Sequence, residues 1–452
     1  MNRVVTFLLV LAACFSFWLS SKFSPHLLNL RKEYRLDQAD PLHNTPPLVA
    51  FTTVALGGFR GILADILWLR ASILQDRGEY FEIVQLSDWI TKLEPRFSQI
   101  WAFHAWNMAY NISVLFEDPA DRWRWVRHGV SLLRDEGLLY NPADAQLYRE
   151  LGWLFEHKLG EHYDEADLYY KKAWAAEMIP LMNGPRPDYA ALAGARPGTP
   201  AAMTKALLTG TYKLDPAAMQ EIDAHYGPLD WRLPQAHALY WAWQGRKFAD
   251  GFELTAADRM ICQSLAQAFR EGRLFLDPAK NLFIPSPNLD LLDGVLKAYA
   301  EALQRRPDDD TFKTGRENFM KDALVFLYAG NRESTAQGLL SQLRTAYPQD
   351  QIPGDLGAFV YQLFTGNTTN VTRDIAMSAV ETAASQGYYW TGLGDTERGT
   401  GFDHLARLSY DRYSRSLPAN AAATNRLPRF EEIEKKARED TNAQPSSAPP
   451  PP

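Results

Sequence analysis

The densest group of side chains able to do chemistry lies between His225 and His237, in the sequence HYGPLDWRLPQAH. A carboxylate near a histidine can perform acid–base catalysis, and Asp230 with Arg232 can recognise an amide or a carboxylate. The same residues can instead cap a turn and fix the junction between two helical regions. We therefore treat Asp230, Arg232 and His237 as a possible second site. In a cell-wall hydrolase, Asp230 or Glu150 would be the acting residue.

Other signatures of catalysis or metal binding are missing from the sequence. It contains no Gly-x-Ser-x-Gly elbow, no His-Glu-x-x-His motif and no phosphate-binding loop. The two cysteines, Cys14 and Cys262, are too few for a thiolate zinc site. His157 and His162 lie five residues apart with a turn between them, which is typical of a solvated turn rather than of a metal site. The sequence therefore predicts no enzymatic activity, no cofactor and no metal.

The charge of the chain argues against a nucleic-acid partner. The formal net charge is −7 and the isoelectric point is about 5.8, whereas nucleic-acid-binding proteins carry a basic face or stripe. One stretch, residues 121–128 (DRWRWVRH), mixes basic and aromatic side chains. Trp123 and Val126 fall on the apolar stripe of a helix there, so we expect the arginines on its solvent face.

Residues 145–178 carry the pattern of a helix pair. Small and large apolar residues stand at fixed places: Leu151, Gly152 and Phe155 on the first helix, then Ala166, Tyr170 and Ala173 on the second. This pattern resembles the tetratricopeptide repeat, in which small residues allow two helices to cross closely and large ones fill the space between. Less regular copies occupy residues 64–97, 98–142 and 317–348, and the resemblance covers about 150 of the 452 residues.

The expected fold class is therefore all-α, as a tetratricopeptide-like α-α superhelix. Each helix pair buries only part of its apolar surface alone and must stack on a neighbour. Apolar residues recur at three- and four-residue intervals, and no sustained period-two alternation is present, which argues against a sheet.

The resemblance also implies a binding groove, because the first helix of each pair lines the concave face of such a superhelix. The expected partner-binding residues are Asp65, Trp68, Trp106, Gln146, Arg149 and Trp153. Ala102, Ala109 and Glu156 would face the same groove. Trp106 and Trp153 hold the same repeat position, so we expect them on adjacent helices. Indole rings offer apolar area and an N–H donor to an extended peptide or a glycan; alternatively, both tryptophans pack between helices.

The N-terminus carries an apolar run without charge, Val4–Ser20. At about 1.5 Å per residue it reaches the lower limit for crossing a bilayer. We expect a retained single-pass transmembrane helix over residues 1–22, in the inner (cytoplasmic) membrane, with the body on the periplasmic or exterior side. Two alternatives stay open: a lipoprotein, because Leu11–Cys14 resembles a lipobox, and a cleaved secretory signal.

The predicted organisation has six segments. In chain order they are an anchor (1–22), a linker (23–60), tetratricopeptide-like repeats (61–176), a Pro/Gly-rich connection (177–234), a C-terminal helical region with a further repeat near 317–348 (235–430), and a disordered Pro-rich tail (431–452). We expect two short helices within the connection.

Four stretches also look like a family of uncharacterised bacterial proteins with one N-terminal membrane segment and helical repeats: GGFRGILADILWLRA, WAFHAWNMAYNISV, LYRELGWLFEHKLG and YGPLDWRLPQAHALYW. This resemblance brings no assigned activity. The sequence predicts a membrane-anchored scaffold that mediates protein–protein interaction in a cell-envelope complex. The alternatives are an envelope enzyme of the cell-wall hydrolase type and a glycan-binding module that uses the groove tryptophans.

Overall fold

The structure is a computed structural model that describes residues 15–16, 18–19, 22, 59–277, 282–366, 371–418 and 420–443. Most of the predicted anchor, most of the linker and the last nine residues of the predicted tail therefore lie outside the described residues. Within the described part of the chain, every helix is too short or too polar to cross a membrane.

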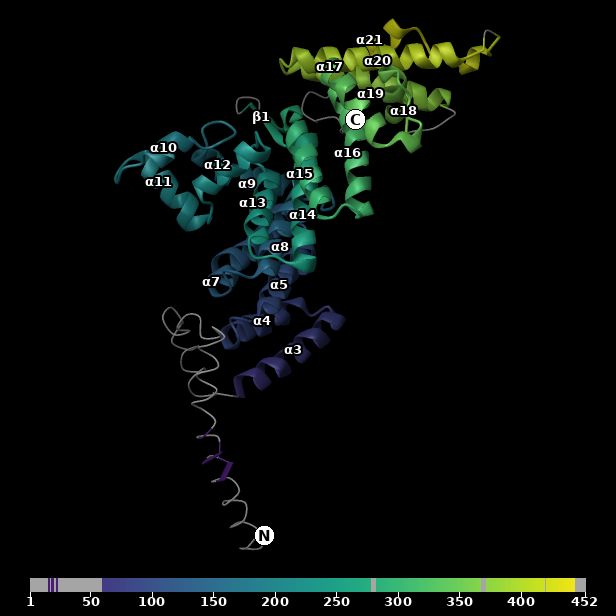
Figure 1. Cartoon of the computed structure of the whole chain (residues 1–452). Coiled ribbons are helices and arrows are strands. Elements are labelled where there is room, and N and C mark those ends of the chain that lie inside the picture. Colours follow the sequence, from purple (N-terminus) through teal and green to yellow (C-terminus); the bar gives the residue numbers. More distant parts are fainter. Residues whose placement is uncertain are drawn as a thin grey trace.

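The first described helices follow one another in space in their chain order (Figure 1). They are α3 (Phe59–Arg77), α4 (Tyr80–Leu93), α5 (Ser98–Trp106), η1 (Asn107–Ile112), η2 (Ser113–Leu115), α6 (Pro119–Ser131), η3 (Leu132–Gly137), α7 (Leu138–Tyr140), α8 (Ala145–Trp153), η4 (Leu154–Gly160) and α9 (Asp167–Met178). Helix α5 packs on α8, and α6 packs on α9. Asp118 and Asp144 set the starts of α6 and α8, because each carboxylate accepts a backbone N–H of the first turn.

The Pro/Gly-rich connection contains three short α-helices rather than two. They are α10 (Tyr189–Ala193), α11 (Pro200–Ala206) and α12 (Pro216–Tyr226), with η5 (Ile179–Leu181) and η6 (Leu207–Thr211) beside them. Each α-helix begins after a side-chain cap, provided by Asp188, Thr199 and Asp215 in turn. Short helices of this kind are marked by their caps more than by apolar periodicity, which is why the sequence pattern missed one of them.

Helices α13 (Pro234–Arg246) and α14 (Gly251–Glu271) form the centre of the molecule. Helix α13 is buried along nearly its whole length and packs on α8, η4 and α14. The glycine of α8 allows α14 to pack closely as well, since a Cβ on Gly152 would lie 2.5 Å from the Sδ of Met260. One continuous apolar core extends from Ala64 on α3 through this centre to Ala437 near the C-terminus.

A two-stranded antiparallel hairpin follows α14, so the expectation that the chain contains no strands is wrong at this point. Its strands are β1 (Arg273–Asp277) and β2 (Leu282–Ser286), with Phe275 opposite Ile284. Each strand has five residues, too few for an alternating pattern to stand out from the sequence around it. The rest of the described chain is helical or irregular, which confirms the all-α class.

The remaining helices form the C-terminal end of the molecule. They are η8 (Leu289–Leu291), α15 (Leu292–Arg305), α16 (Asp310–Ala329), α17 (Glu333–Ala346), η9 (Pro348–Asp350), α18 (Leu356–Phe364), α19 (Arg373–Gly392), α20 (Thr396–Ser416), η10 (Ala423–Asn425) and α21 (Phe430–Ala443). Helices α19 and α20 cross closely at a pair of glycines, because a Cβ on Gly387 would lie 3.2 Å from the carbonyl oxygen of Gly399.

Helix α21 corrects the prediction of a disordered tail from residue 431 onward. Its apolar side chains Phe430, Ile433 and Ala437 are 7%, 2% and 3% exposed, and the helix packs on α19. Their spacing of three and four residues places them on one helical face. The proline-rich end of the chain dominates the composition of the segment and hides this short amphipathic pattern.

Candidate functional site

Five aromatic side chains contact one another through their rings, and we call this cluster the aromatic ladder. Its members are Trp106, Tyr110, Trp153, His157 and Tyr163. Trp106 stacks on Tyr110 with 5.4 Å between ring centroids, and Tyr110 approaches His157 at 5.8 Å. The ring of His157 lies between Trp153 at 4.7 Å and Tyr163 at 4.8 Å, nearly parallel to both. The ladder therefore joins the end of α5 to the end of α8.

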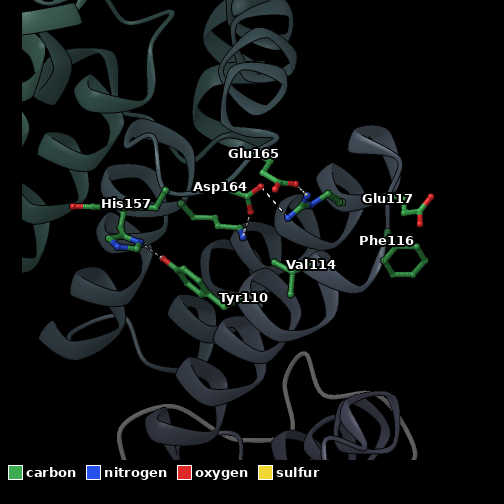
Figure 2. Close-up of a pocket in the computed structure, with 10 residues that line it drawn as sticks. Tyr110, Val114, Phe116, Glu117, His157, Asp164 and Glu165 are labelled. Atoms are coloured by element: carbon green, nitrogen blue, oxygen red, sulfur yellow. Dashed lines mark hydrogen bonds and ion pairs between the residues drawn. The ribbon is translucent and has the colours of Figure 1, made fainter. Parts of the chain in front are cut away.

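A hydrogen bond connects the two halves of the ladder. The hydroxyl of Tyr110 lies 3.1 Å from Nδ1 of His157 (Figure 2). Burial and the charge of Lys158 lower the pKa of His157, so the ring is neutral at pH 7 and its Nδ1 can accept. Burial and the charge of Glu150 raise the pKa of Tyr110, so the phenol keeps its proton and donates it to this bond.

Two π-helical turns contain members of the ladder. Segment η1 begins directly after Trp106, and η4 begins directly after Trp153. A π-helix uses i→i+5 hydrogen bonds, so its turn holds more residues than an α-helical turn. The residue four positions after each tryptophan, Tyr110 or His157, lies within its π-helical turn and stacks on that tryptophan. Turns of this type are frequent at functional sites.

The two tryptophans of the ladder are accessible. Trp106 is 39% exposed, Trp153 is 38% exposed and Tyr163 is 76% exposed. The sequence predicted that both tryptophans lie on adjacent helices of one groove. The structure places them at equivalent ends of α5 and α8, which pack together. An exposed row of rigid rings offers a surface for apolar side chains or sugar rings.

A pocket of about 670 Å³ opens beside the ladder (Figure 2). Tyr110, His157 and Tyr163 contribute to its lining, and the charged lining residues are Glu117, Arg122, Lys158, Asp164 and Glu165. Two cations meet one carboxylate in this lining: the Nζ of Lys158 lies 2.5 Å from Asp164, and an Nη of Arg122 lies 3.1 Å from it.

These three charges are buried and neutralise one another in part. The side chains of Lys158, Asp164 and Arg122 are 4%, 6% and 11% exposed. Burial lowers the pKa of Lys158 in spite of its bond to Asp164. Burial alone would raise the pKa of Asp164, but the hydrogen bond from Lys158 and the charge of Arg122 outweigh it, and the pKa is lowered. Lys158 and Asp164 therefore both stay ionised in the folded protein.

Gln146 and Arg149 lie on α8, on the same helical face as Trp153. The Nε of Arg149 donates to Glu253 at 2.8 Å, and one of its Nη atoms lies 2.8 Å from Glu150. Gln146 is half-buried. Two carboxylates thus neutralise Arg149, which holds α8 to α14 and does not present an unpaired charge to a ligand.

Asp65 and Trp68, the remaining two predicted groove residues, lie on α3. Trp68 is half-buried and packs edge-to-face on Phe97 at 5.9 Å and on Phe103 at 5.0 Å. Asp65 is exposed. The contacts of these two residues do not join them to the ladder.

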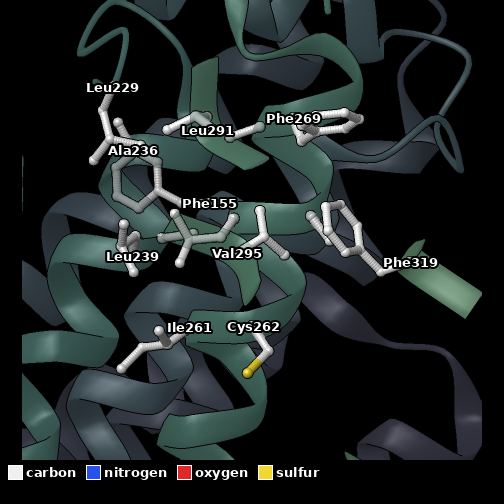
Figure 3. Close-up of a cluster of buried hydrophobic side chains, with 14 of the residues drawn as sticks. Phe155, Leu229, Ala236, Leu239, Ile261, Cys262, Phe269, Leu291, Val295 and Phe319 are labelled. Atoms are coloured by element: carbon white, nitrogen blue, oxygen red, sulfur yellow. The ribbon is translucent and has the colours of Figure 1, made fainter. Parts of the chain in front are cut away.

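Three further residues that we expected in the groove lie in the core. Ala102, Ala109 and Glu156 are 8%, 0% and 6% exposed. The π-helical turns rotate Ala109 and Glu156 inward, and Glu156 follows Phe155, which belongs to the buried cluster in Figure 3. Burial and the charge of Glu161 raise the pKa of Glu156 to about 8, so this carboxyl is protonated at neutral pH.

The possible second site is engaged in contacts that hold the fold together. Asp230 is 3% exposed and accepts from Arg232 at 2.8 and 2.7 Å and from the backbone N–H of Leu274 at 2.9 Å. The pair thereby fixes β1 to the segment before α13. His237 is buried, its Nε2 lies 2.9 Å from the carbonyl oxygen of Trp231, and burial lowers its pKa to about 4. No hydrogen bond among the described residues joins His237 to Asp230.

Sequence reasoning missed Tyr110, Arg122 and Lys158 and misplaced His157. We expected His157 in a solvated turn, but it lies inside the ladder; we expected Arg122 on a solvent face, but it is buried against Asp164. The sequence held one usable signal, namely an aromatic ring four residues after each repeated tryptophan.

In the described ranges, no three His, Cys, Asp or Glu side chains are grouped so that they can hold a metal ion. The candidate site consists of the ladder rings and the ion pairs beside them. No protein-family model, no curated protein and no solved structure matches this chain.

Proposed function

We propose that this chain is a membrane-anchored helical-repeat scaffold of the cell envelope, and that its aromatic ladder binds an extended segment of a protein partner. The observation that carries this proposal is the ladder, which brings Trp106 and Trp153 to one accessible surface beside a pocket. Large rigid aromatic side chains contribute much of the binding energy in protein interfaces. The anchor is the apolar run Val4–Ser20, with the body on the periplasmic or exterior side of the inner membrane.

The finer architecture that we propose is a tetratricopeptide-like stack. In its support, α5 packs on α8 and α6 on α9, so the first helices of two successive pairs are neighbours and so are the second helices. Trp106 ends α5 and Trp153 ends α8, which is what a common repeat phase requires. A π-helical turn after each of them extends the correspondence.

The charges around the pocket indicate the chemistry of the partner. Asp164 engages both buried cations. Glu165 lies 3.7 Å from an Nη of Arg122, but its side chain is 95% exposed, and Glu117 is exposed as well. A partner segment with apolar or aromatic side chains would lie on the ladder, and a basic side chain would meet Glu117 and Glu165. A segment of this kind suits an extended peptide.

The envelope-enzyme alternative would use Asp230 or Glu150. Asp230 is engaged by Arg232 and a backbone N–H, and Glu150 is paired with Arg149. Neither carboxylate lines the pocket beside the ladder. Activity lost on Asp230→Asn in a protein that keeps its fold would favour the enzyme over the scaffold.

Photo-crosslinking in native membranes tests the scaffold directly. A photoreactive residue in place of Tyr163, the most exposed member of the ladder, should capture the partner for identification by mass spectrometry. The double variant Trp106→Ala, Trp153→Ala should then lose the partner, since each tryptophan contributes roughly 2 kcal/mol, or about 30-fold in affinity. Trp89→Ala, at a tryptophan that is 46% exposed on α4, is the matched control and should retain it.

Two outcomes would contradict the proposal. Partner binding retained by a folded double variant would remove the ladder from the interface. Quenching of tryptophan fluorescence by oligosaccharides in the wild-type protein, but not in the double variant, would assign the ladder to a glycan instead.

A further inference from the structure

Helix α3 carries apolar side chains on two opposite faces. One face packs on α4 and the core through Ala64, Leu67, Ala71 and Leu74. The opposite face presents Ile62, Ile66, Leu69 and Ile73, which are 57%, 58%, 64% and 52% exposed. The terminal unit of a helical stack usually has a polar outer face that keeps it soluble. A continuous aliphatic stripe at this place marks an interaction surface.

The spacing of the exposed stripe specifies the kind of surface. Its members follow one another at intervals of four, three and four residues, as the d and a positions of a heptad do. Ile66 and Ile73 take the a positions, and Ile62 and Leu69 take the d positions. In parallel coiled coils, β-branched residues at a with leucine at d, as in Ile66, Leu69 and Ile73, favour two strands. The other d position, Ile62, is isoleucine.

Charged residues on the flanks of the stripe select the same orientation. Asp65 is exposed at a g position, and Arg70 occupies the following e position. The Arg70 side chain is 63% exposed and lies 3.4 Å from Glu82 of the same chain, a surface contact that leaves its other nitrogens accessible. In a parallel coiled coil a g residue faces the residue five positions further along the other helix. Asp65 of each chain would then meet Arg70 of the other, twice by symmetry. In an antiparallel pair g positions share a flank with g positions and e positions with e positions, so Asp65 of one chain would not meet Arg70 of the other.

We propose that α3 forms a parallel two-stranded coiled coil with a second copy of this chain. The stripe of Ile62, Ile66, Leu69 and Ile73 forms its core, and the reciprocal pairs of Asp65 with Arg70 set its register. The contact is short and weak by itself. Anchoring of both chains in one membrane, which rests on the proposed function, would raise their local concentration and orient them in parallel. The dimer would also carry two ladders and bind a repetitive partner bivalently.

Cysteine crosslinking in native membranes tests the pairing on the full chain with Cys14→Ser. Cys262 stays, because it is buried. Under mild oxidation Ile73→Cys should give a disulfide-linked dimer, since equal a positions face each other in a parallel pair. Leu139→Cys, at an α7 side chain that is 60% exposed, is the control. The proposal would be overturned if Ile73→Cys crosslinks no more strongly than Leu139→Cys. It would also be overturned if disulfides form only between an Ile62→Cys chain and an Ile73→Cys chain, because that result indicates antiparallel helices.

Charge reversal separates a second copy from any other occupant of this face. Asp65→Arg and Arg70→Asp should each reduce the Ile73→Cys crosslink roughly two- to five-fold, because like charges then meet at both flanks. Chains carrying one reversal each, with different tags, should form mixed dimers in excess when co-expressed, since both ion pairs are restored. A lipid surface or an unrelated protein would show no such preference. If mixed dimers form only as often as random association predicts, the proposed pairing of the two α3 helices is wrong. That result would not affect the tryptophan experiment that tests the ladder.

Discussion

The hydroxyl of Tyr110 lies 3.1 Å from Nδ1 of His157, and this bond joins π-helical turns of two successive helix pairs. The two turns place the rings on the same side of their helices, so that the stack continues from Trp106 to Tyr163. Because a π-turn is uncommon and needs support from its surroundings, we infer that the bond helps to maintain the backbone that creates the ladder.

Removing this bond should weaken the fold moderately. Tyr110→Phe keeps the ring and deletes the hydroxyl, which leaves the half-buried Nδ1 of His157 without its donor. We expect the free energy of unfolding to fall by about 1 kcal/mol in urea denaturation. Tyr163→Phe, at a side chain that is 76% exposed, should change it by less than about 0.5 kcal/mol. Equal effects of both substitutions would contradict a structural role for the bond.

The buried ion pairs predict an asymmetry between two variants. Asp164→Ala leaves Lys158 and Arg122 buried without their carboxylate, so we expect a loss of about 3–5 kcal/mol in the free energy of unfolding. Lys158→Met should cost clearly less, because Asp164 keeps its contact with Arg122 at 3.1 Å. Glu117→Ala, at an exposed carboxylate that lines the same pocket, serves as the control. A Lys158→Met variant as unstable as Asp164→Ala would show that Arg122 does not compensate Asp164.

Glu156→Gln should stabilise the fold at pH 7 and have little effect at pH 4. The pKa of Glu156 is raised from 4.5 to about 8 by burial. As the pH rises above 4.5 the unfolded chain ionises this carboxyl while the folded protein keeps its proton, so unfolding becomes progressively easier until about pH 8. The glutamine amide does not ionise, so this pH-dependent destabilisation is absent from the variant. We expect its free energy of unfolding at pH 7 to exceed that of the wild type by on the order of 2 kcal/mol. Urea unfolding of both proteins at several pH values measures this difference in the free energy of unfolding. A difference that does not change with pH would contradict the ionisation argument.

His162 should make stability depend on pH in the opposite way. Its hydrogen bonds with Asp167 and Glu271 outweigh burial and raise its pKa from 6.5 to about 9. The resulting stabilisation is complete below pH 6.5 and is lost as the pH rises through about 9. Since the side chain is 58% exposed, we expect only about 1 kcal/mol after solvent screening. Thermal unfolding of His162→Gln should lack this slope, whereas His128→Gln should keep it; an unchanged slope in His162→Gln would exclude His162 as its source.

The helical class of the protein and the relation between its two key tryptophans were accessible from the sequence. Apolar residues recur at helical intervals, and this periodicity alone indicates helices whose apolar faces pack together. The tetratricopeptide-like phase that we assigned from the sequence gives Trp106 and Trp153 the same repeat position and therefore predicts that they lie on adjacent helices. Both inferences depend on local spacing, which a sequence displays directly.

Tertiary structure decided which side chains surround those tryptophans. Two π-helical turns exchange the expected neighbours Ala109 and Glu156 for Tyr110 and His157, and no local pattern announces a single inserted residue within a helix. Arg122 is buried only because Asp164, from a later loop, supplies its counter-charge. Local spacing specifies a helix and its apolar face, whereas contacts between residues far apart in the chain select the turn type and determine which polar groups can be buried.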